Sequence, residues 1–306
     1  MKRKASKPEA PEKKQGASEK LHAASFSIFV NAFLIAVKLV VAIITGSIAI
    51  LAEFFHSLFD MLASVLAYLG IKKADQPADR DHMFGHEKFE NISSFAQTVL
   101  IAVTSILIIY EALGRLAAPK IPEALGLGLA VMILTVAIDW LISRYLHSMS
   151  RKHGSPALEA DAYHFTTDLW SSLAVIVGLI FVLLGFQIFD SLAAMVVAIL
   201  MLWISYKLGK KSIHVLMDMS PPESTVRKIE EITGSTRGVR HFHGLRVRQA
   251  GNRLLVEIHI HLPAKMTISE GHRIAHFLKE KLMKEIPEIK DVTVHTEPAK
   301  RKGRLA

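Results

Sequence analysis

The sequence predicts an α-helical membrane protein, with six transmembrane helices followed by a cytoplasmic α+β domain. The chain of 306 residues is 51% hydrophobic and has a mean hydropathy of +0.32, which is too apolar for a soluble domain of this size. Its first two thirds contain six apolar stretches, each near the roughly 20 residues that a helix needs to cross a bilayer. The remaining third is polar and contains alternating, strand-like segments.

The elements follow one another in a simple order. Residues 1–22 carry mostly Lys, Glu, Pro and Ser, and we expect a disordered cytoplasmic tail there. The predicted transmembrane domain covers residues 23–213. Its expected spans lie at about 24–45, 49–72, 91–113, 123–147, 156–185 and 187–211.

The short loops predict the orientation, because Lys and Arg gather on the cytoplasmic side. They are frequent in the N-terminal tail, in the second and fourth loops and behind the sixth span, and are absent from the first and fifth loops. Both termini are therefore expected in the cytoplasm, with a prokaryotic plasma membrane as the default location. The formal charge of +9 is assigned to this flanking pattern and to lipid headgroups, so nucleic-acid binding is not expected.

The predicted cytoplasmic domain covers residues 214–298, and a basic tail, 299–306, follows it. A helix is expected at 224–233, and strands at 242–249 and 254–262 are joined by a Gly-Asn turn. An amphipathic helix at 269–286, with Ser269 as its N-cap, precedes a last strand at 292–296. The order αββαβ indicates a two-layer α+β sandwich.

Two His/Asp pairs lie within predicted spans. His56 precedes Asp60 by four residues, and His164 precedes Asp168 by four. Residues i and i+4 share one face of a helix, so two such helices facing each other would present two imidazoles and two carboxylates to one point. This tetrahedral set suits zinc. Charged groups at this depth are costly and usually functional. Since the chain has no Cys, any transition-metal site must use His and carboxylates.

The loop between the second and third spans offers a second candidate site. Asp79, His82 and His86 could converge on a metal ion, because Gly85 allows a turn between the two His residues. A hydrated polar loop is the alternative, and these residues alone favour it.

The cytoplasmic domain has its own His-rich pattern. The period of two puts Glu257, His259 and His261 on one strand face, and His295 shares a face with Glu297 on the last strand. Any one of these residues fits a solvated strand face. His side chains arriving from several elements favour a metal cluster instead. The other contributing positions are His243, His272 and His276.

Two further polar residues lie inside predicted spans. Lys38 in the first span is expected to reach the interface or to pair with another group. Asp139 in the fourth span either accepts a hydrogen bond from a neighbouring helix or takes part in an ion path. The residues alone do not decide between these roles.

The whole chain after residue 22 resembles the cation diffusion facilitator family of zinc and related divalent-metal transporters. The resemblance rests on the HxxxD pairs of the second and fifth spans, on Gly46–Glu53 before the first pair and on Phe84–Lys88 in the loop. It implies a homodimer, metal–proton antiport and a ferredoxin-like cytoplasmic domain that binds metal at the dimer interface. It also reverses the preference for a hydrated loop, and the ligand sets that it implies are His56, Asp60, His164 and Asp168 for transport, Asp79, His82 and His86 in the loop, and His243, His259, His272, His295 and Glu297 in the cytoplasmic domain.

We therefore predict a Zn2+/H+ antiporter that moves zinc out of the cytoplasm, with zinc also regulating transport through the cytoplasmic domain. The alternative within this fold is an exporter of Co2+, Fe2+, Cd2+ or Mn2+. An intramembrane zinc-dependent hydrolase is disfavoured, because the chain has no HExxH motif and the four ligands leave no open coordination position. A receptor or scaffold with a metal-sensing tail would not explain His and Asp at mid-membrane depth. No enzyme activity is expected.

Overall fold

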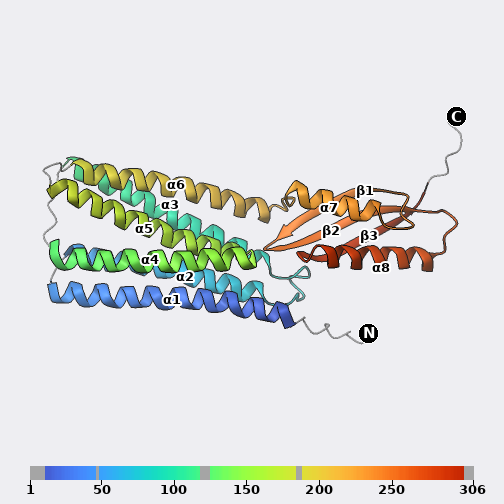
Figure 1. Ribbon diagram of the computed structural model, residues 1–306, viewed down its shortest axis with the longest axis horizontal. Coiled ribbons are helices and arrows are strands. Elements are labelled where there is room, and N and C mark those ends of the chain that lie inside the picture. Colours follow the sequence, from blue (N-terminus) through green and yellow to red (C-terminus); the bar gives the residue numbers. More distant parts are fainter. Residues whose placement is uncertain (1–10, 46–47, 118–124, 184–187, 300–306) are drawn as a thin grey trace. The chain divides into compact units, whose positions relative to one another are not determined.

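The computed structural model describes residues 11–45, 48–117, 125–183 and 188–299 (Figure 1). The chain divides into two compact units, Met1–Ile213 and His214–Ala306. The described residues of the first unit form helices and the loops at 75–87 and 154–155, and the second unit combines two helices with a small sheet. Each unit is described by itself below.

The first unit contains six long helices among its described residues, and each expected span falls largely within one of them. The helices have 27 to 35 residues, so each is about 40 Å long or longer, which exceeds the roughly 30 Å of a bilayer's hydrocarbon core. Within the described residues, two segments combine the length and apolar composition of a membrane span, Gly16–Val41 and Lys88–Gly114. The helices are α1 (Pro11–Thr45), α2 (Ile48–Ala74), α3 (Lys88–Ala117), α4 (Leu125–His153), α5 (Pro156–Leu183) and α6 (Ile188–Leu216).

Helix α1 begins earlier than the sequence indicates. We expected a disordered tail through residue 22, whereas the helix already begins at Pro11. Proline fits the first turn of a helix, where its missing N–H is not needed. Farther along, the Glu19 carboxylate pairs with Lys152 and with His153 of α4, and Lys20 pairs with Glu90 of α3. These ion pairs give a polar segment tertiary partners, which composition alone does not reveal.

Small side chains let the helices of the first unit approach closely. Helix α2 packs against α1, α3 and α5, and α4 packs against α5 and α1. The buried core at these contacts includes Ala23, Ala67, Ala157 and Ala162, each without exposed surface. Helix α6 is joined to α3 by the Ser205 hydroxyl, which donates to a carbonyl of α3 at 2.6 Å.

The second unit is the expected αββαβ sandwich. The three-stranded sheet has the order β1-β2-β3, with β1 and β2 antiparallel and β2 and β3 parallel. Both helices cover one face of this sheet, where Ile258 and Ile260 meet Leu278 and Leu282 in a fully buried core. The opposite face carries the alternate residues of each strand. The elements are α7 (Glu223–Gly234), β1 (His241–Ala250), β2 (Arg253–Leu262), α8 (Ile268–Glu285) and β3 (Ile289–Pro298).

One local prediction in this unit is wrong. Thr267, not Ser269, is the N-cap of α8. The Thr267 hydroxyl accepts from the backbone N–H of Glu270 at 3.3 Å, and the Glu270 carboxylate accepts from the backbone N–H of Thr267 at 2.8 Å. This reciprocal arrangement satisfies two donors at the helix start, whereas Ser269 lies inside the first turn.

Candidate metal centres

The first candidate centre, the bundle cluster, consists of Asp60 of α2 with His164 and Asp168 of α5. The His164 Nε2 atom lies 3.3 Å from Asp60 Oδ1 and 3.6 Å from Asp168 Oδ2. Potential ligand atoms of all three lie within 4.8 Å of one another. Asp60 and His164 are only 6% and 3% exposed. The i,i+4 spacing has therefore placed two carboxylates and an imidazole around one point inside the bundle.

The fourth member of the predicted transport set is His56. Its backbone belongs to α2, one helical turn before Asp60. Its side chain lies outside those that the structure describes, so its part in the cluster stays a prediction.

A buried hydrogen-bond network holds the two helices of the bundle cluster in register. Ser64, one turn after Asp60, donates to Asp161 Oδ1 at 2.7 Å. The Ser64 hydroxyl in turn accepts from Ser27 at 2.6 Å and from Asn31 at 2.9 Å, both on α1. All four side chains are buried. Sequence reasoning missed Asp161, although its spacing of three residues before His164 puts it near the same helix face.

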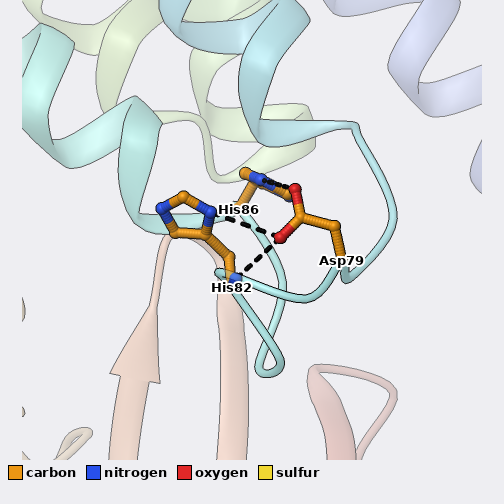
Figure 2. Close-up of side chains that lie close together, drawn as sticks. All are labelled: Asp79, His82 and His86. Carbon is orange, nitrogen blue, oxygen red and sulfur yellow. Dashed lines mark hydrogen bonds and ion pairs between the residues drawn. The ribbon is translucent and has the colours of Figure 1, made fainter.

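The second candidate centre, the loop cluster, consists of Asp79, His82 and His86 between α2 and α3. Figure 2 shows the Asp79 carboxylate between the two imidazole rings. Its Oδ2 lies 3.2 Å from His86 Nε2, and its Oδ1 lies 3.4 Å from His82 Nδ1. Gly85 has φ +97°, a value that L side chains rarely adopt, and it reverses the chain so that the rings approach. The structure thus brings all three predicted residues together.

Backbone groups of the loop hold the side chains of Asp79 and His86 in place. The pKa of Asp79 lies below its ordinary value because the backbone N–H of His82 donates to the carboxylate, at 2.7 Å, and the N–H of Asp81 adds a second bond. The His86 Nδ1 atom lies 3.3 Å from the carbonyl of Gln76. A carbonyl only accepts, so Nδ1 carries the proton and a neutral His86 directs the Nε2 lone pair at Asp79. His86 Nε2 and Asp79 Oδ2 both carry lone pairs and lie 3.2 Å apart, so they repel each other unless a proton or a metal ion lies between them.

The third candidate centre, the sheet cluster, consists of His243 of β1, His259 of β2 and Glu297 of β3. It lies on the sheet face that the helices leave open. His259 Nδ1 lies 3.0 Å from Glu297 Oε1, and His243 Nε2 lies 3.7 Å from the same oxygen. The predicted alternation of strand faces is the reason for this convergence, because strand pairing sets His243 beside His259 and His259 beside His295.

The histidines that lie next to these three residues are not all members of the predicted ligand set. His295 belongs to it, with Nε2 3.7 Å from Glu297 Oε1. His261 joins it as well, since its Nε2 lies 3.1 Å from His243 Nδ1. In this chain His272 lies away from the cluster, exposed on α8, the helix that covers the other sheet face, so its part as a ligand stays a prediction. The alternating pattern of β2 identified the face of His261, but gave no reason to choose it as a ligand.

Glu297 holds the sheet cluster together electrostatically. The pKa of this carboxyl lies below its ordinary value because His259 donates to it, and His243 and His261 add attraction. Gly244, which has φ +61°, follows His243 at an irregularity in the pairing of β1 and β2. A Cβ atom there would lie 3.2 Å from His259 Cδ2, so glycine lets the imidazole lie close against the strand.

All three clusters combine imidazole nitrogen with carboxylate oxygen, the donor set of borderline divalent transition metals. In a helical membrane protein such a set defines a class, the transporters and sensors of divalent metals. Residues 24–217 match the family described as cation efflux transmembrane domain, and residues 221–299 match the cytoplasmic domain of cation efflux proteins.

Two curated relatives are similar to this chain over most of its length. A cation-efflux pump FieF of Serratia proteamaculans is 28% identical over 265 residues, covering 87% of this chain and 88% of the relative. An uncharacterised transporter of Synechocystis is 33% identical over 259 residues, covering 83% of each chain. The solved metal-bound C-terminal domain of the CzcD transporter from Thermotoga maritima has a TM-score of 0.25 and 24% identity, over 26% of this chain and 93% of that one.

The chain belongs to the cation diffusion facilitator family. It is a membrane protein, a divalent cation efflux transporter with a cytoplasmic domain, and not an enzyme. The predictions of family, of fold class and of a transporter rather than a hydrolase are thus confirmed.

Proposed function

We propose that this transporter is a Zn2+/H+ antiporter, in which zinc from the cytoplasm binds at the bundle cluster together with His56. The observation that carries the proposal is the convergence of the buried Asp60 and His164 with the half-buried Asp168 around one point between two helices. Ionisable groups inside a membrane are expensive, and a divalent cation is the partner that offsets two carboxylates. Zinc accepts a tetrahedral set of two nitrogen and two oxygen ligands.

The donor set favours zinc over harder cations. Mn2+ prefers sites made of oxygen, and two imidazoles lower its relative affinity. Co2+ accepts nearly the same ligands as Zn2+ and is the closest competitor, with Fe2+ and Cd2+ next. The cation-efflux pumps named FieF are similar to this chain over most of their length, which supports cation efflux but leaves the metal to be measured.

Competition between metal and protons for the same ligands couples the efflux of zinc to the entry of protons. A metal ion binds neutral imidazole and ionised carboxylate, so protons displace it. Histidine titrates near physiological pH and fits this exchange. Protons that enter from the far side would release zinc there and occupy the ligands during the return of the empty carrier. The return step is then easier, because the carboxylates are not left without a counter-charge.

The proposal includes a topology and an assembly. Six spans with both termini in the cytoplasm follow from the lengths of α1 to α6 and from the Lys and Arg of the loops. A prokaryotic plasma membrane is the proposed location. Dimerisation through the second unit is supported by its match to the cytoplasmic domain of cation efflux proteins. Zinc at the loop and sheet clusters would serve regulation, by favouring one arrangement of the dimer.

The test is zinc flux into liposomes that contain the purified full-length protein, under an imposed pH gradient. The parent protein should move zinc, and a protonophore should stop it. Asp60→Ala and His164→Ala should each abolish flux, whereas Glu90→Gln, an equally buried carboxylate outside the cluster, should retain it. Flux that persists in both cluster variants would reject the site, and flux that ignores the pH gradient would reject antiport.

Metal selectivity is measured in the same liposomes. Zinc should be carried best, followed by cobalt, with manganese slowest. A faster rate for manganese or iron than for zinc would replace zinc in the proposal and leave divalent-cation efflux intact.

A further inference from the structure

His261 lies in the sheet cluster but has no assigned role there. It belongs to β2 and shares a strand face with His259, and strand pairing sets it beside His241 of β1 and Glu297 of β3. Its side chain is 18% exposed, whereas those of the other three histidines of the cluster are 42% to 62% exposed. His261 is therefore the most enclosed of these four imidazoles and the least accessible to an ion from solution.

The two ring nitrogens of His243 face different partners. Its Nε2 atom lies 3.7 Å from Glu297 Oε1, the oxygen that also lies 3.0 Å from His259 Nδ1. Its Nδ1 atom, on the other side of the ring, lies 3.1 Å from His261 Nε2. One nitrogen of His243 therefore faces the carboxylate at the centre of the sheet cluster, and the other nitrogen faces His261.

The contact between His243 and His261 requires a proton. Two ring nitrogens that both present lone pairs at 3.1 Å repel each other, whereas one N–H between them makes a hydrogen bond. A neutral imidazole carries its single proton on one of its two nitrogens. With that proton on Nδ1, His243 donates to His261 and keeps the Nε2 lone pair for a metal ion. With His261 as the donor, His243 carries its proton on Nε2 and cannot bind a metal ion through that atom.

The position of Glu297 favours the first of these two arrangements when a metal ion is bound. The Oε1 atom of Glu297 lies on the Nε2 side of His243, so a metal ion shared by these two residues takes the Nε2 lone pair. The Nδ1 atom of His243 must then be the donor. Glu297 Oε2 lies 3.7 Å from His261 Nε2, too far for a hydrogen bond, so His261 Nε2 can accept from His243. Histidine ligands generally donate their other N–H to such an acceptor, which fixes the tautomer and the ring orientation.

We propose that His261 is the positioning residue of a metal centre at the sheet cluster, where it accepts a hydrogen bond from His243 and so presents the Nε2 lone pair of His243 to the metal ion. The inference rests on the metal-binding role proposed above for this cluster. His261 is not itself a ligand in this arrangement, because its Nε2 lone pair accepts the bond from His243. The ligand set that the family resemblance implies does not include His261.

Removing the acceptor should weaken metal binding without removing a binding position. His261→Leu offers no acceptor, so the affinity of the sheet cluster for Zn2+ should fall about tenfold or more. His261→Gln can place a carbonyl oxygen near the position of Nε2, so its affinity should stay within about threefold of the parent value. The number of ions bound per chain should be the same in the parent and in both variants.

The measurement is calorimetric titration of the purified full-length protein with Zn2+, in a background that carries Asp60→Ala and His86→Ala to weaken the bundle and loop clusters. His241→Leu is the matched control, because it removes an exposed imidazole beside His261 on the same sheet face and should leave the affinity unchanged. Thermal melting without metal separates folding defects from changes in affinity. The visible absorption of bound Co2+, which depends on the number and type of ligands, should be the same in the parent and in His261→Leu.

Four results would overturn the inference. These are an unchanged affinity in His261→Leu, a loss in His261→Gln that equals the loss in His261→Leu, one ion fewer per chain in both variants, or an equal loss in His241→Leu. Each of them leaves metal binding at the sheet cluster intact. A background protein that binds no Zn2+ would instead reject regulation through this cluster and the inference with it, so the two failures are distinguishable.

Discussion

The bundle cluster and the sheet cluster are built from the same two kinds of side chain in opposite surroundings. In the bundle cluster, His164 is 3% exposed and both its ring nitrogens lack a hydrogen-bond partner among the described residues. In the sheet cluster, the side chains of His243 and Glu297 are 45% and 31% exposed, and His259 bonds directly to Glu297. Water can therefore satisfy the sheet cluster when no metal is bound, whereas the bundle cluster depends on protons or on its cargo.

The same two kinds of ligand can therefore serve two tasks, depending on whether they are buried or exposed to water. A buried site needs either a metal ion or protons in every state of the transport cycle, which suits a carrier that exchanges metal ions for protons. An exposed site can stay empty at little cost, which suits a sensor whose occupancy follows the cytoplasmic metal concentration.

The largest effect is expected from removing one ligand of each cluster. Asp168→Ala should lower the rate of zinc transport about 100-fold or more, because the buried imidazole and the remaining carboxylate cannot enclose the ion. His259→Ala should lower it no more than about threefold and should weaken its dependence on cytoplasmic zinc. Flux in liposomes at several internal zinc concentrations measures both. Equal losses in the two variants would erase the proposed division of tasks.

The second prediction concerns the network that supports the bundle cluster. Ser64→Ala removes the donor to Asp161 and leaves a fully buried carboxylate short of a hydrogen bond, which should cost about 1–3 kcal/mol of stability. Ser212→Ala is the matched control, because its buried hydroxyl bonds only to the neutral Ser94 and should cost about 1 kcal/mol. Thermal melting in detergent compares them. A larger loss in the control variant would contradict the role given to Ser64.

The third prediction concerns pH at the sheet cluster. The folded-state pKa of Glu297 lies below its ordinary 4.5, so its stabilising contribution is complete above that value and is lost as the pH falls through the lower folded-state pKa. Between pH 7.5 and 5.5 the carboxylate therefore stays ionised, and competition between protons and metal for the ligands weakens metal binding as the pH falls. Calorimetric titration of the full-length protein should show this weakening.

The control for the pH prediction is Glu297→Gln. Its thermal melting temperature without metal should lie below that of the parent at both pH 7.5 and pH 5.5, because the carboxylate of the parent is ionised at both. The difference should shrink only at more acid pH. A difference that already vanishes at pH 5.5 would show that the carboxylate is not held ionised by His259.

The smallest effect is expected at Gly244. Gly244→Ala places a Cβ atom at φ +61° and 3.2 Å from the His259 ring, which should cost about 1 kcal/mol and lower metal affinity at the sheet cluster a fewfold. Gly114→Ala in α3 is the contrast, because a Cβ atom there meets nothing within 4 Å. That change should stabilise the helix slightly. Melting temperatures that respond alike to both substitutions would remove the packing argument at Gly244.

Sequence periodicity predicted the elements well, because apolar runs and strand alternation reflect burial directly. The helices at 224–233 and 269–286 and all three strands lie within a few residues of the observed ones. The loop cluster could be named as a candidate from sequence, since its three residues lie within eight positions of one another, and the family resemblance then favoured it over a hydrated loop. These features depend on residues that lie close together in the sequence, so the sequence alone can indicate them.

The remaining features depend on contacts between distant residues. The early start of α1 requires Lys152 and Glu90, which lie far along the chain from Glu19 and Lys20. Asp161 was overlooked because its importance comes from Ser64 on another helix. His272 was assigned from family resemblance, and it is exposed on α8 away from the sheet cluster in this chain, so that assignment stays a prediction.

The hydroxyl of Ser64 lies at a junction of three helices, since it contacts Ser27 and Asn31 of α1 and Asp161 of α5 while belonging to α2. Separating α2 from α5 would remove the donor of the buried Asp161 carboxylate, and moving α1 away would break both of its bonds to Ser64. The three are therefore expected to travel as one rigid block, and any pivot that opens the pathway to the opposite side must lie between this block and the other helices.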